Sequence, residues 1–204
     1  AAVALHALRR PGRNLMGRSV AIFGAGPIGL MAAQWARAMG ATPIFLFDIV
    51  ARKLEMARAL GFALAFDNRA DDPAAVIRAT VGGDGVYLTV EGAGVPQTFV
   101  QAATCTARGG CTVILGNPAA DVTLPAPLIS QLMRREVELV GAWNSDYSAA
   151  GNDDDWRAVL NGMAARTIDL EPLITHRVLL RDAADVLRRM RDGSGFFSKV
   201  LVVP

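Results

Sequence analysis

The chain has 204 residues, of which 52% are hydrophobic and 20% charged, and its mean hydropathy is +0.30. This composition excludes a disordered chain, and the length is sufficient to bury a sizeable core in one large domain. The 21 basic and 19 acidic residues leave a net charge of only +2 with no long basic run, which argues against nucleic acid as a partner.

Short apolar runs rich in Val, Ile, Leu and Phe alternate along the chain with segments of helical composition. Because these runs are continuously apolar, we expect strands that are buried on both faces. The alternation predicts an α/β Rossmann fold, a doubly wound parallel six-stranded sheet with helices on both faces. The expected strands cover residues 19–23, 43–47, 63–66, 85–90, 111–115 and 137–141, and the expected helices cover residues 27–39, 51–60, 72–80, 95–107 and 128–135.

The alternation changes after Gly141. Asp153, Asp154 and Asp155 precede a helix expected at residues 156–165, which they would cap. We therefore expect two parts. Residues 1–142 would form the sheet with a lead-in helix, and residues 143–204 would return beside the sheet or toward a neighbouring domain. In this second part we expect an extended segment at 173–180, a helix at 183–190 and a strand at 199–203.

The sequence also bears on membrane segments and on location. Residues 19–36 are uncharged, but glycines, Pro27 and Gln34 interrupt them, so we expect no membrane span and no membrane partner. No signal peptide is expected either, which leaves the cytoplasm as the expected location. Residues 1–8 have a helical composition without Met or a capping residue, which indicates the middle of a longer protein.

The sharpest motif is Gly24-Ala25-Gly26-Pro27-Ile28-Gly29, which follows the first expected strand and opens a helix. Gly24 permits a tight turn, Gly26 lets the backbone approach a pyrophosphate, and Gly29 allows the helix to pack closely on the strand. The helix N-terminus offers unpaired N–H groups and a positive dipole end to the anion. The same pattern also occurs in turns that serve packing only, so its context decides.

Asp48 supplies that context at the end of the second expected strand, 19 residues after Gly29. Its carboxylate can accept hydrogen bonds from the adenosine ribose hydroxyls and would repel a 2′-phosphate, which favours NAD over NADP. Arg52 and Lys53 follow one turn later, either near the adenosine or as solvated surface charges, and Arg52 leaves some tolerance of NADP. Small residues at three further strand ends, 91–94, 115–117 and 142–144, are expected at the same edge of the sheet.

Together these residues resemble the medium-chain, zinc-dependent alcohol dehydrogenase family over nearly the whole chain. The resemblance rests on residues 24–29, Asp48 with Lys53, 90–94, 113–116, 170–176 and 198–201. Within the family, the chain looks most like galactitol-1-phosphate or sorbitol dehydrogenases. The resemblance implies NAD contacts from Pro27, Ile28, Asp48, Lys53, Ala93, Leu115, Gly116 and Ala142, with Lys199 near the pyrophosphate.

The resemblance also implies a catalytic domain that has no counterpart in these residues. That N-terminal domain carries the family's zinc ligands and proton relay, so we expect no catalytic and no metal-ligating residue in this chain. His6 and His176 stand in unrelated contexts, and Cys105 and Cys111 are expected to be buried apolar groups. The expected function is the cofactor-binding half of a zinc-dependent oxidoreductase. The whole enzyme would transfer hydride between NAD and a secondary alcohol of a polyol or polyol phosphate.

Other functions and an assembly remain open on this sequence. A stand-alone NAD-binding module without catalysis would need the chain to be complete. A zinc-free quinone or enoyl reductase commonly uses NADPH, which Asp48 opposes, and a methyltransferase also places glycines after its first strand. The last expected strand, 137–141, would lie at a sheet edge, so we expect a homodimer or homotetramer through it.

Overall fold

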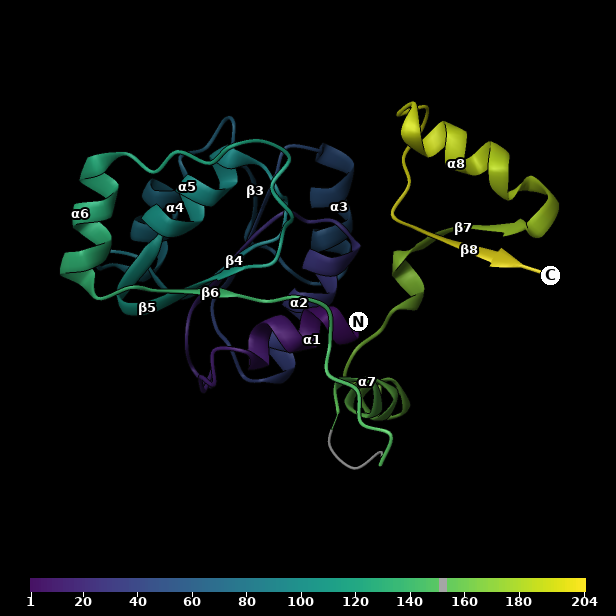
Figure 1. Ribbon diagram of the computed structural model, residues 1–204, viewed down its shortest axis with the longest axis horizontal. Helices are drawn as coiled ribbons and strands as arrows, with labels where there is room; N and C mark the ends of the chain where they lie inside the picture. Colours follow the sequence, from purple (N-terminus) through teal and green to yellow (C-terminus); the bar gives the residue numbers. More distant parts are fainter. Residues whose placement is uncertain (151–153) are drawn as a thin grey trace. The chain divides into compact units, whose positions relative to one another are not determined.

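The computed structural model describes residues 1–150 and 154–204, and Figure 1 shows its helices and strands. The described chain forms two compact units, Ala1–Ile168 and Asp169–Pro204. The strands of the first unit are β1 (Val20–Phe23), β2 (Ile44–Asp48), β3 (Ala65–Asp67), β4 (Val86–Glu91), β5 (Thr106–Ile114) and β6 (Glu138–Gly141). Its helices are α1 (Ala2–Arg9), α2 (Pro27–Ala38), α3 (Ala51–Ala59), α4 (Pro73–Val81), α5 (Pro96–Thr104), α6 (Ala126–Arg135) and α7 (Asp155–Ala164).

The six strands form one parallel sheet in the order β3-β2-β1-β4-β5-β6. This is the strand order of the doubly wound dinucleotide-binding fold, so the predicted fold class is confirmed. The first three strands are added in one direction from β1 and the last three in the other, so the strand order switches between the neighbours β1 and β4. In such folds a ligand binds beyond the carboxyl ends of the strands at that point.

Strand β5 begins earlier than expected. The sequence predicted a helix through residue 107, but α5 ends at Thr104 and Thr106 already pairs with Val86. The hydroxyl of Thr106 lies 2.9 Å from that of Thr89 and 2.7 Å from that of Thr112, in a fully buried group. These contacts satisfy a polar side chain inside the sheet, which propensity alone does not indicate.

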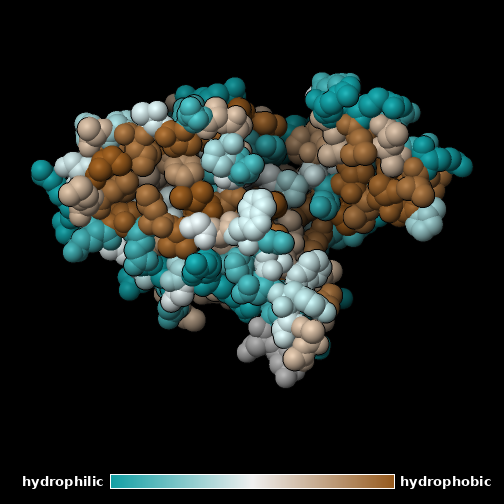
Figure 2. Space-filling view, viewed as in Figure 1, coloured by the Kyte–Doolittle hydropathy of each residue, from teal (hydrophilic) through white to brown (hydrophobic). Residues whose placement is uncertain are grey.

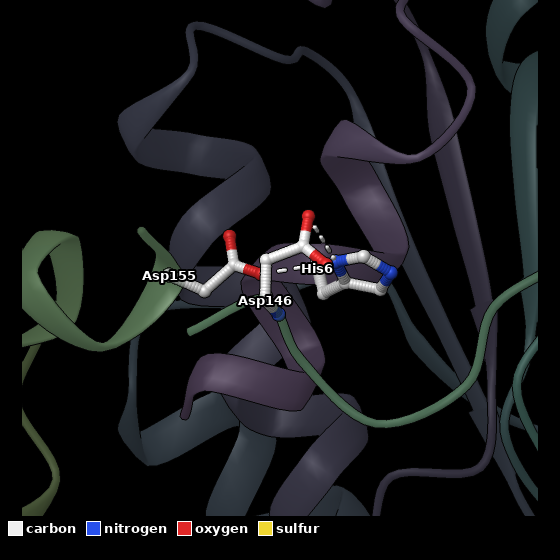
Figure 3. Close-up of side chains that lie close together, drawn as sticks. All are labelled: His6, Asp146 and Asp155. Carbon is white, nitrogen blue, oxygen red and sulfur yellow. Dashed lines mark hydrogen bonds and ion pairs between the residues drawn. The ribbon is translucent and has the colours of Figure 1, made fainter. Parts of the chain in front are cut away.

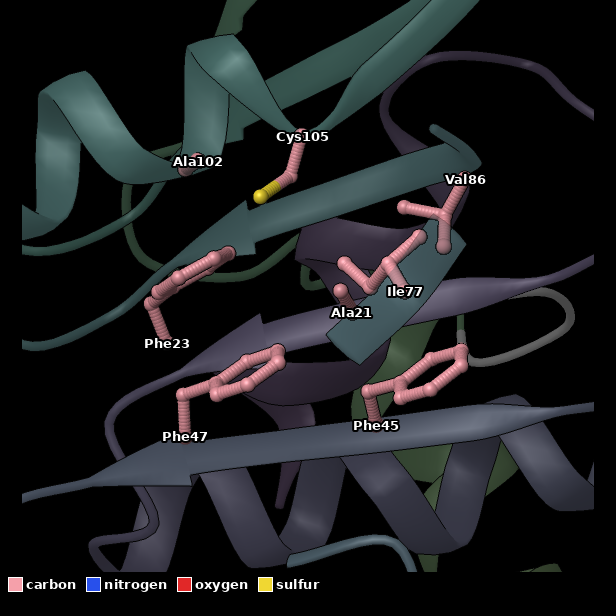
Figure 4. Packing of buried hydrophobic residues seen from close by; sticks show 8 residues of the cluster. All are labelled: Ala21, Phe23, Phe45, Phe47, Ile77, Val86, Ala102 and Cys105. Carbon is pink, nitrogen blue, oxygen red and sulfur yellow. The ribbon is translucent and has the colours of Figure 1, made fainter. Parts of the chain in front are cut away.

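One face of the sheet is built around three phenylalanines, drawn in Figure 4. The ring centroids of Phe23 and Phe47 lie 5.0 Å apart, and Phe45 stacks beyond Phe47 on the same strand. Ile77 of α4 and Ala102 of α5 cover these rings. Each buried phenylalanine stabilises the fold by about 1.5–3 kcal/mol. This core fixes the strand ends that form the site below.

The first unit extends to Ile168, past the boundary near residue 142 that the end of the strand–helix alternation suggested. The reason is that α7 packs against α1 through polar contacts. Asp155 accepts hydrogen bonds from His6 (2.9 Å) and Arg9 (3.1 Å) on α1. Asp154 caps α7 as expected by accepting from the N–H of Arg157. Asp153 lies outside the described residues.

The edge strand β6 and the helix before it carry exposed apolar side chains. Leu139 of β6 is 44% exposed, and Met133 of the preceding helix α6 is 74% exposed. Figure 2 shows apolar side chains gathered on the side of the first unit where Figure 1 draws α6 and β6. An apolar strand edge of this kind is a ready template for pairing with another chain.

The second unit, taken by itself, is a strand–helix–strand motif with its own small sheet. It contains β7 (Ile174–Leu179), α8 (Ala183–Arg191) and β8 (Lys199–Val203), with short 3-10 helices η1 (Glu171–Leu173) and η2 (Leu180–Asp182). Strands β7 and β8 pair in parallel and do not join the six-stranded sheet. None of the helices that the structure describes in either unit combines the length and the apolar character needed to cross a membrane.

Candidate cofactor-binding site

Two of the three motif glycines are required by packing within the protein. Gly24 has a φ of +102°, and a Cβ there would lie 2.9 Å from the backbone nitrogen of Ala93. A Cβ on Gly29 would lie 1.8 Å from the carbonyl oxygen of Gly24, where no side chain can fit. The first and third glycines therefore let β1, the loop after β4 and helix α2 approach one another.

Gly26 differs from these two because the protein itself does not require it. Its φ is −71°, which any residue adopts, and a Cβ there would meet no described atom within 4 Å. Gly26 is the N-cap of α2, Pro27 is the first helical residue, and no described side chain caps this helix. The amide end of α2 thus faces open space, which is the arrangement that binds an anion.

Asp48 closes the side of this opening from the end of β2. Only 7% of the residue is exposed, and its carboxylate accepts hydrogen bonds from the N–H groups of Ala25 (2.8 Å) and Val50 (2.9 Å). The Nζ of Lys53 lies 3.2 and 3.4 Å from the two carboxylate oxygens. The structure therefore brings Asp48 and Lys53 together with the glycine turn.

Glu91 organises the loop after β4, a role that the sequence analysis missed. It is fully buried, and its Oε1 accepts from the N–H groups of Ala93 and Gly94 at 2.9 Å and from the hydroxyl of Thr98 at 2.8 Å. A Cβ on Gly116 would lie 2.6 Å from Glu91 Oε2, so packing explains that glycine. The available signal was a glutamate that ends a strongly apolar strand and precedes two glycines.

The glycine turn, Asp48, Lys53 and the loop after β4 line a pocket of about 310 Å³ at the carboxyl ends of β1, β2 and β4. From the predicted residues it contains Gly24, Gly26, Asp48, Lys53 and Ala93. Its apolar lining includes Ile49, Val50 and Val95, and its polar lining also includes Asn68. A small, mostly apolar pocket with a few convergent polar groups is typical of a ligand site.

The other predicted residues lie outside the lining of this pocket. Pro27, Ile28 and Gly29 form the first turn of α2. Leu115 and Gly116 follow β5, and Ala142 follows β6, so all three stand at the same edge of the sheet as the pocket. Lys199 begins β8 in the second unit. Their contacts with a cofactor stay predictions.

His6, Asp146 and Asp155 bring three potential metal-ligating atoms close together (Figure 3). The buried carboxylate of Asp155 already accepts from His6 Nδ1, from Arg9 and from the N–H of Asp146. The adjacent guanidinium would oppose a divalent cation, and the bonded His6 nitrogen is not free to ligate one. The cluster therefore fits an ion-paired clamp between α1 and α7 and does not fit the zinc that the resemblance implies.

The two cysteines do not supply zinc ligands either. Both are free and buried, and burial raises the pKa of Cys105 to about 12 and that of Cys111 to about 11. A thiol ligates zinc as the thiolate, which these environments disfavour. Their role as buried apolar groups agrees with the sequence expectation.

Comparison with known proteins places this geometry in a family. The chain is 32% identical over 191 residues to L-threonine 3-dehydrogenase of Bacillus velezensis, covering 94% of this chain and 52% of that protein. It is 30% identical over 205 residues to galactitol 1-phosphate 5-dehydrogenase of Escherichia coli, covering 99% and 58%. The chain thus spans about half the length of the curated relatives that it matches.

Solved structures agree with these relatives. The crystal structure of the Escherichia coli galactitol-1-phosphate dehydrogenase superposes with a TM-score of 0.87 at 30% identity, covering 100% of this chain and 58% of that one. A zinc-binding dehydrogenase of Sinorhizobium meliloti bound to NADP superposes with a TM-score of 0.82 at 29% identity, covering 100% and 57%. The family model for zinc-binding dehydrogenases matches residues 27–165. The predicted resemblance is confirmed, and the chain belongs to the zinc-binding dehydrogenase family.

Proposed function

We propose that this chain is the NAD-binding part of a dehydrogenase that oxidises a secondary alcohol. One observation carries the proposal: Gly26 lies at the uncapped N-terminus of α2 and leaves open space that no packing contact explains. A diphosphate bound there would accept hydrogen bonds from the first-turn amides and gain from the helix dipole. The buried carboxylate of Asp48 stands beside this position, ready for the hydroxyls of the attached ribose.

The residues of the pocket would bind and orient the cofactor. Bound NAD supplies a nicotinamide carbon that accepts a hydride from the alcohol carbon. The ribose hydroxyls would share Asp48 with Lys53, whose contacts are the longest at that carboxylate. Glu91 would hold the loop of residues 92–94 in place beside the cofactor.

NAD rather than NADP is our proposal for the cofactor. The relative from Sinorhizobium meliloti binds NADP, so family membership alone leaves the choice open. In this chain the support is Asp48, because a buried carboxylate at the ribose position repels a 2′-phosphate. Lys53 partly offsets that charge, so the preference is best expressed as the ratio of the affinities for NAD and NADP.

The substrate, the metal and the assembly complete the proposal. The relatives' names describe oxidation of secondary alcohols in polyol phosphates and in threonine. We propose a polyol or polyol phosphate as the substrate and zinc bound by residues other than those described here.

We also propose that β6 pairs with a second copy, giving a homodimer or homotetramer. The reduced, buried cysteines suit the cytoplasm, which we propose as the location.

Calorimetric titration of the chain with NAD tests the proposal. The Gly26→Ala variant should fold normally and bind NAD about tenfold more weakly, because the new methyl group occupies the diphosphate position. Gly141→Ala is the matched control, since a Cβ at Gly141 also meets nothing within 4 Å and lies away from the pocket. Absence of NAD binding, or equal binding by the Gly26→Ala variant, would contradict the proposal. The chain alone should show no turnover.

A further inference from the structure

Asn68 has a buried acceptor that the protein leaves without a donor. The residue follows β3, lines the pocket and is 6% exposed. Its side-chain Oδ1 is buried and has no hydrogen-bond partner among the residues that the structure describes. Buried carbonyl oxygens are nearly always paired, because leaving one unpaired costs its full desolvation energy.

The orientation of this amide is fixed by Gln101 on α5. The Nδ2 of Asn68 donates to Gln101 Oε1 at 2.7 Å, and Gln101 Nε2 donates back to the Asn68 carbonyl at 3.2 Å. Rotating the Asn68 amide would set its Oδ1 against Gln101 Oε1, oxygen against oxygen. The amide therefore presents an acceptor, and its missing partner must be a hydrogen-bond donor.

The strand order indicates what that donor is. In the sheet, β1, β2 and β3 are successive neighbours, and their carboxyl ends present Gly26, Asp48 and Asn68 in turn. On the proposed function, the diphosphate lies at the first position and the ribose at the second. The nucleobase then continues toward the third, between the apolar walls of Ile49 and Val95. Adenine carries one exocyclic hydrogen-bond donor, its 6-amino group, which would lie at the end of that path.

We propose that Asn68 is a specificity-determining residue that accepts a hydrogen bond from the 6-amino group of the adenine base. A 6-oxo purine, such as hypoxanthine, presents an acceptor at that position and would set two oxygens against each other. The site would therefore discriminate between dinucleotides by one substituent of the purine ring. This inference rests on the proposed function, because it needs the dinucleotide to lie along β1, β2 and β3.

The test compares NAD with nicotinamide hypoxanthine dinucleotide, which carries a 6-oxo group in place of the 6-amino group and a proton on the neighbouring N1. The wild-type chain should bind NAD about tenfold more tightly, as expected for one lost hydrogen bond and one oxygen–oxygen contact. In the Asn68→Leu variant the two affinities should become equal. Asn161→Leu, the same change on the exposed face of α7, should keep the wild-type ratio.

A second variant separates recognition from folding. Gln101→Leu removes the group that holds the Asn68 amide, so the amide can rotate and donate to a 6-oxo group. This variant should keep its NAD affinity and bind the hypoxanthine analogue nearly as well. A merely structural role for Asn68 would instead change both affinities together.

The outcomes distinguish this inference from the proposed function. If the wild-type chain binds both dinucleotides equally well, Asn68 does not read the base and its Oδ1 is satisfied by water, while the proposed function stands. If the wild-type ratio persists in the Asn68→Leu variant, another group reads the base and the inference is wrong. If neither dinucleotide binds, the proposed function fails and this inference fails with it.

Discussion

The N–H of Ala25 donates a hydrogen bond of 2.8 Å to Asp48 Oδ2, which joins the turn after β1 to the end of β2. The residue predicted to hold the ribose thus also positions the turn predicted to hold the diphosphate. Val50 donates to the other carboxylate oxygen, so the side chain has a fixed orientation. The two subsites are coupled through one carboxylate.

Substitutions of Asp48 should separate these two tasks. Asp48→Asn keeps an acceptor for Ala25, removes the charge and turns an amide NH2 toward the N–H of Val50, so the unfolding free energy should fall by about 1 kcal/mol while NADP affinity rises about tenfold relative to NAD. Asp48→Ala removes both the acceptors and the charge, so NAD affinity should fall about tenfold or more and the unfolding free energy by about 1.5–3 kcal/mol. Titration calorimetry and urea unfolding measure the two effects. Asp71→Asn, at an exposed position, is the control, and an unchanged cofactor preference in Asp48→Asn would refute the charge argument.

Gly29→Ala should prevent normal folding. Its Cβ would lie 1.8 Å from the Gly24 carbonyl oxygen, and both groups belong to backbone that cannot move without separating α2 from β1. We expect a loss of at least about 3 kcal/mol in unfolding free energy, measured by urea denaturation. Gly26→Ala should stay within about 1 kcal/mol of the wild type. Similar stabilities for the two variants would show that the turn is not packed as described.

Acidification should weaken the start of α7. Hydrogen bonds from the N–H groups of Arg157 and Ser148 lower the pKa of Asp154 in the folded state. A lowered folded pKa gives stability that is complete above the unfolded value, about 3.9, and is lost as the pH falls through the folded value. The stability difference between wild type and Asp154→Ala should therefore be full at about pH 6 and shrink below about pH 4. Urea unfolding across this range measures it, and a pH-independent difference would exclude the ionised cap.

A charge on the edge strand should shift the assembly toward monomer. Leu139 is 44% exposed on β6, where a second copy would pair. Leu139→Lys places a charge on each side of that contact, and light scattering after gel filtration should show a smaller species. Leu160→Lys, on the exposed face of α7, should leave the mass unchanged. An unchanged mass for Leu139→Lys would exclude this edge as the interface.

The sequence predicted the sheet and the glycine turn because both depend on local information. Short continuous apolar runs between turn residues favour strands buried on two faces, and the spacing of Gly24, Gly26, Gly29 and Asp48 reflects one strand, one turn and one neighbouring strand. The motif spacing already assigned close packing to Gly29 and an open position to Gly26, but the sequence could not say how differently a Cβ would fit at each glycine. That difference depends on which backbone atoms of β1, β4 and α2 meet.

Only the tertiary structure decided the partners of the buried polar groups. His6 and Asp155 are separated by 149 residues, and Asn68 and Gln101 by 33, so no local pattern connects either pair. Periodicity reports which face of an element is buried, but a hydrogen bond depends on where two distant elements meet. For this chain, the sequence determined the fold and the place of the glycine motif through short-range spacing. The clamp of α7 on α1, and the Asn68–Gln101 pair that leaves Asn68 Oδ1 without a donor among the described residues, arose only when the fold brought residues distant in sequence together.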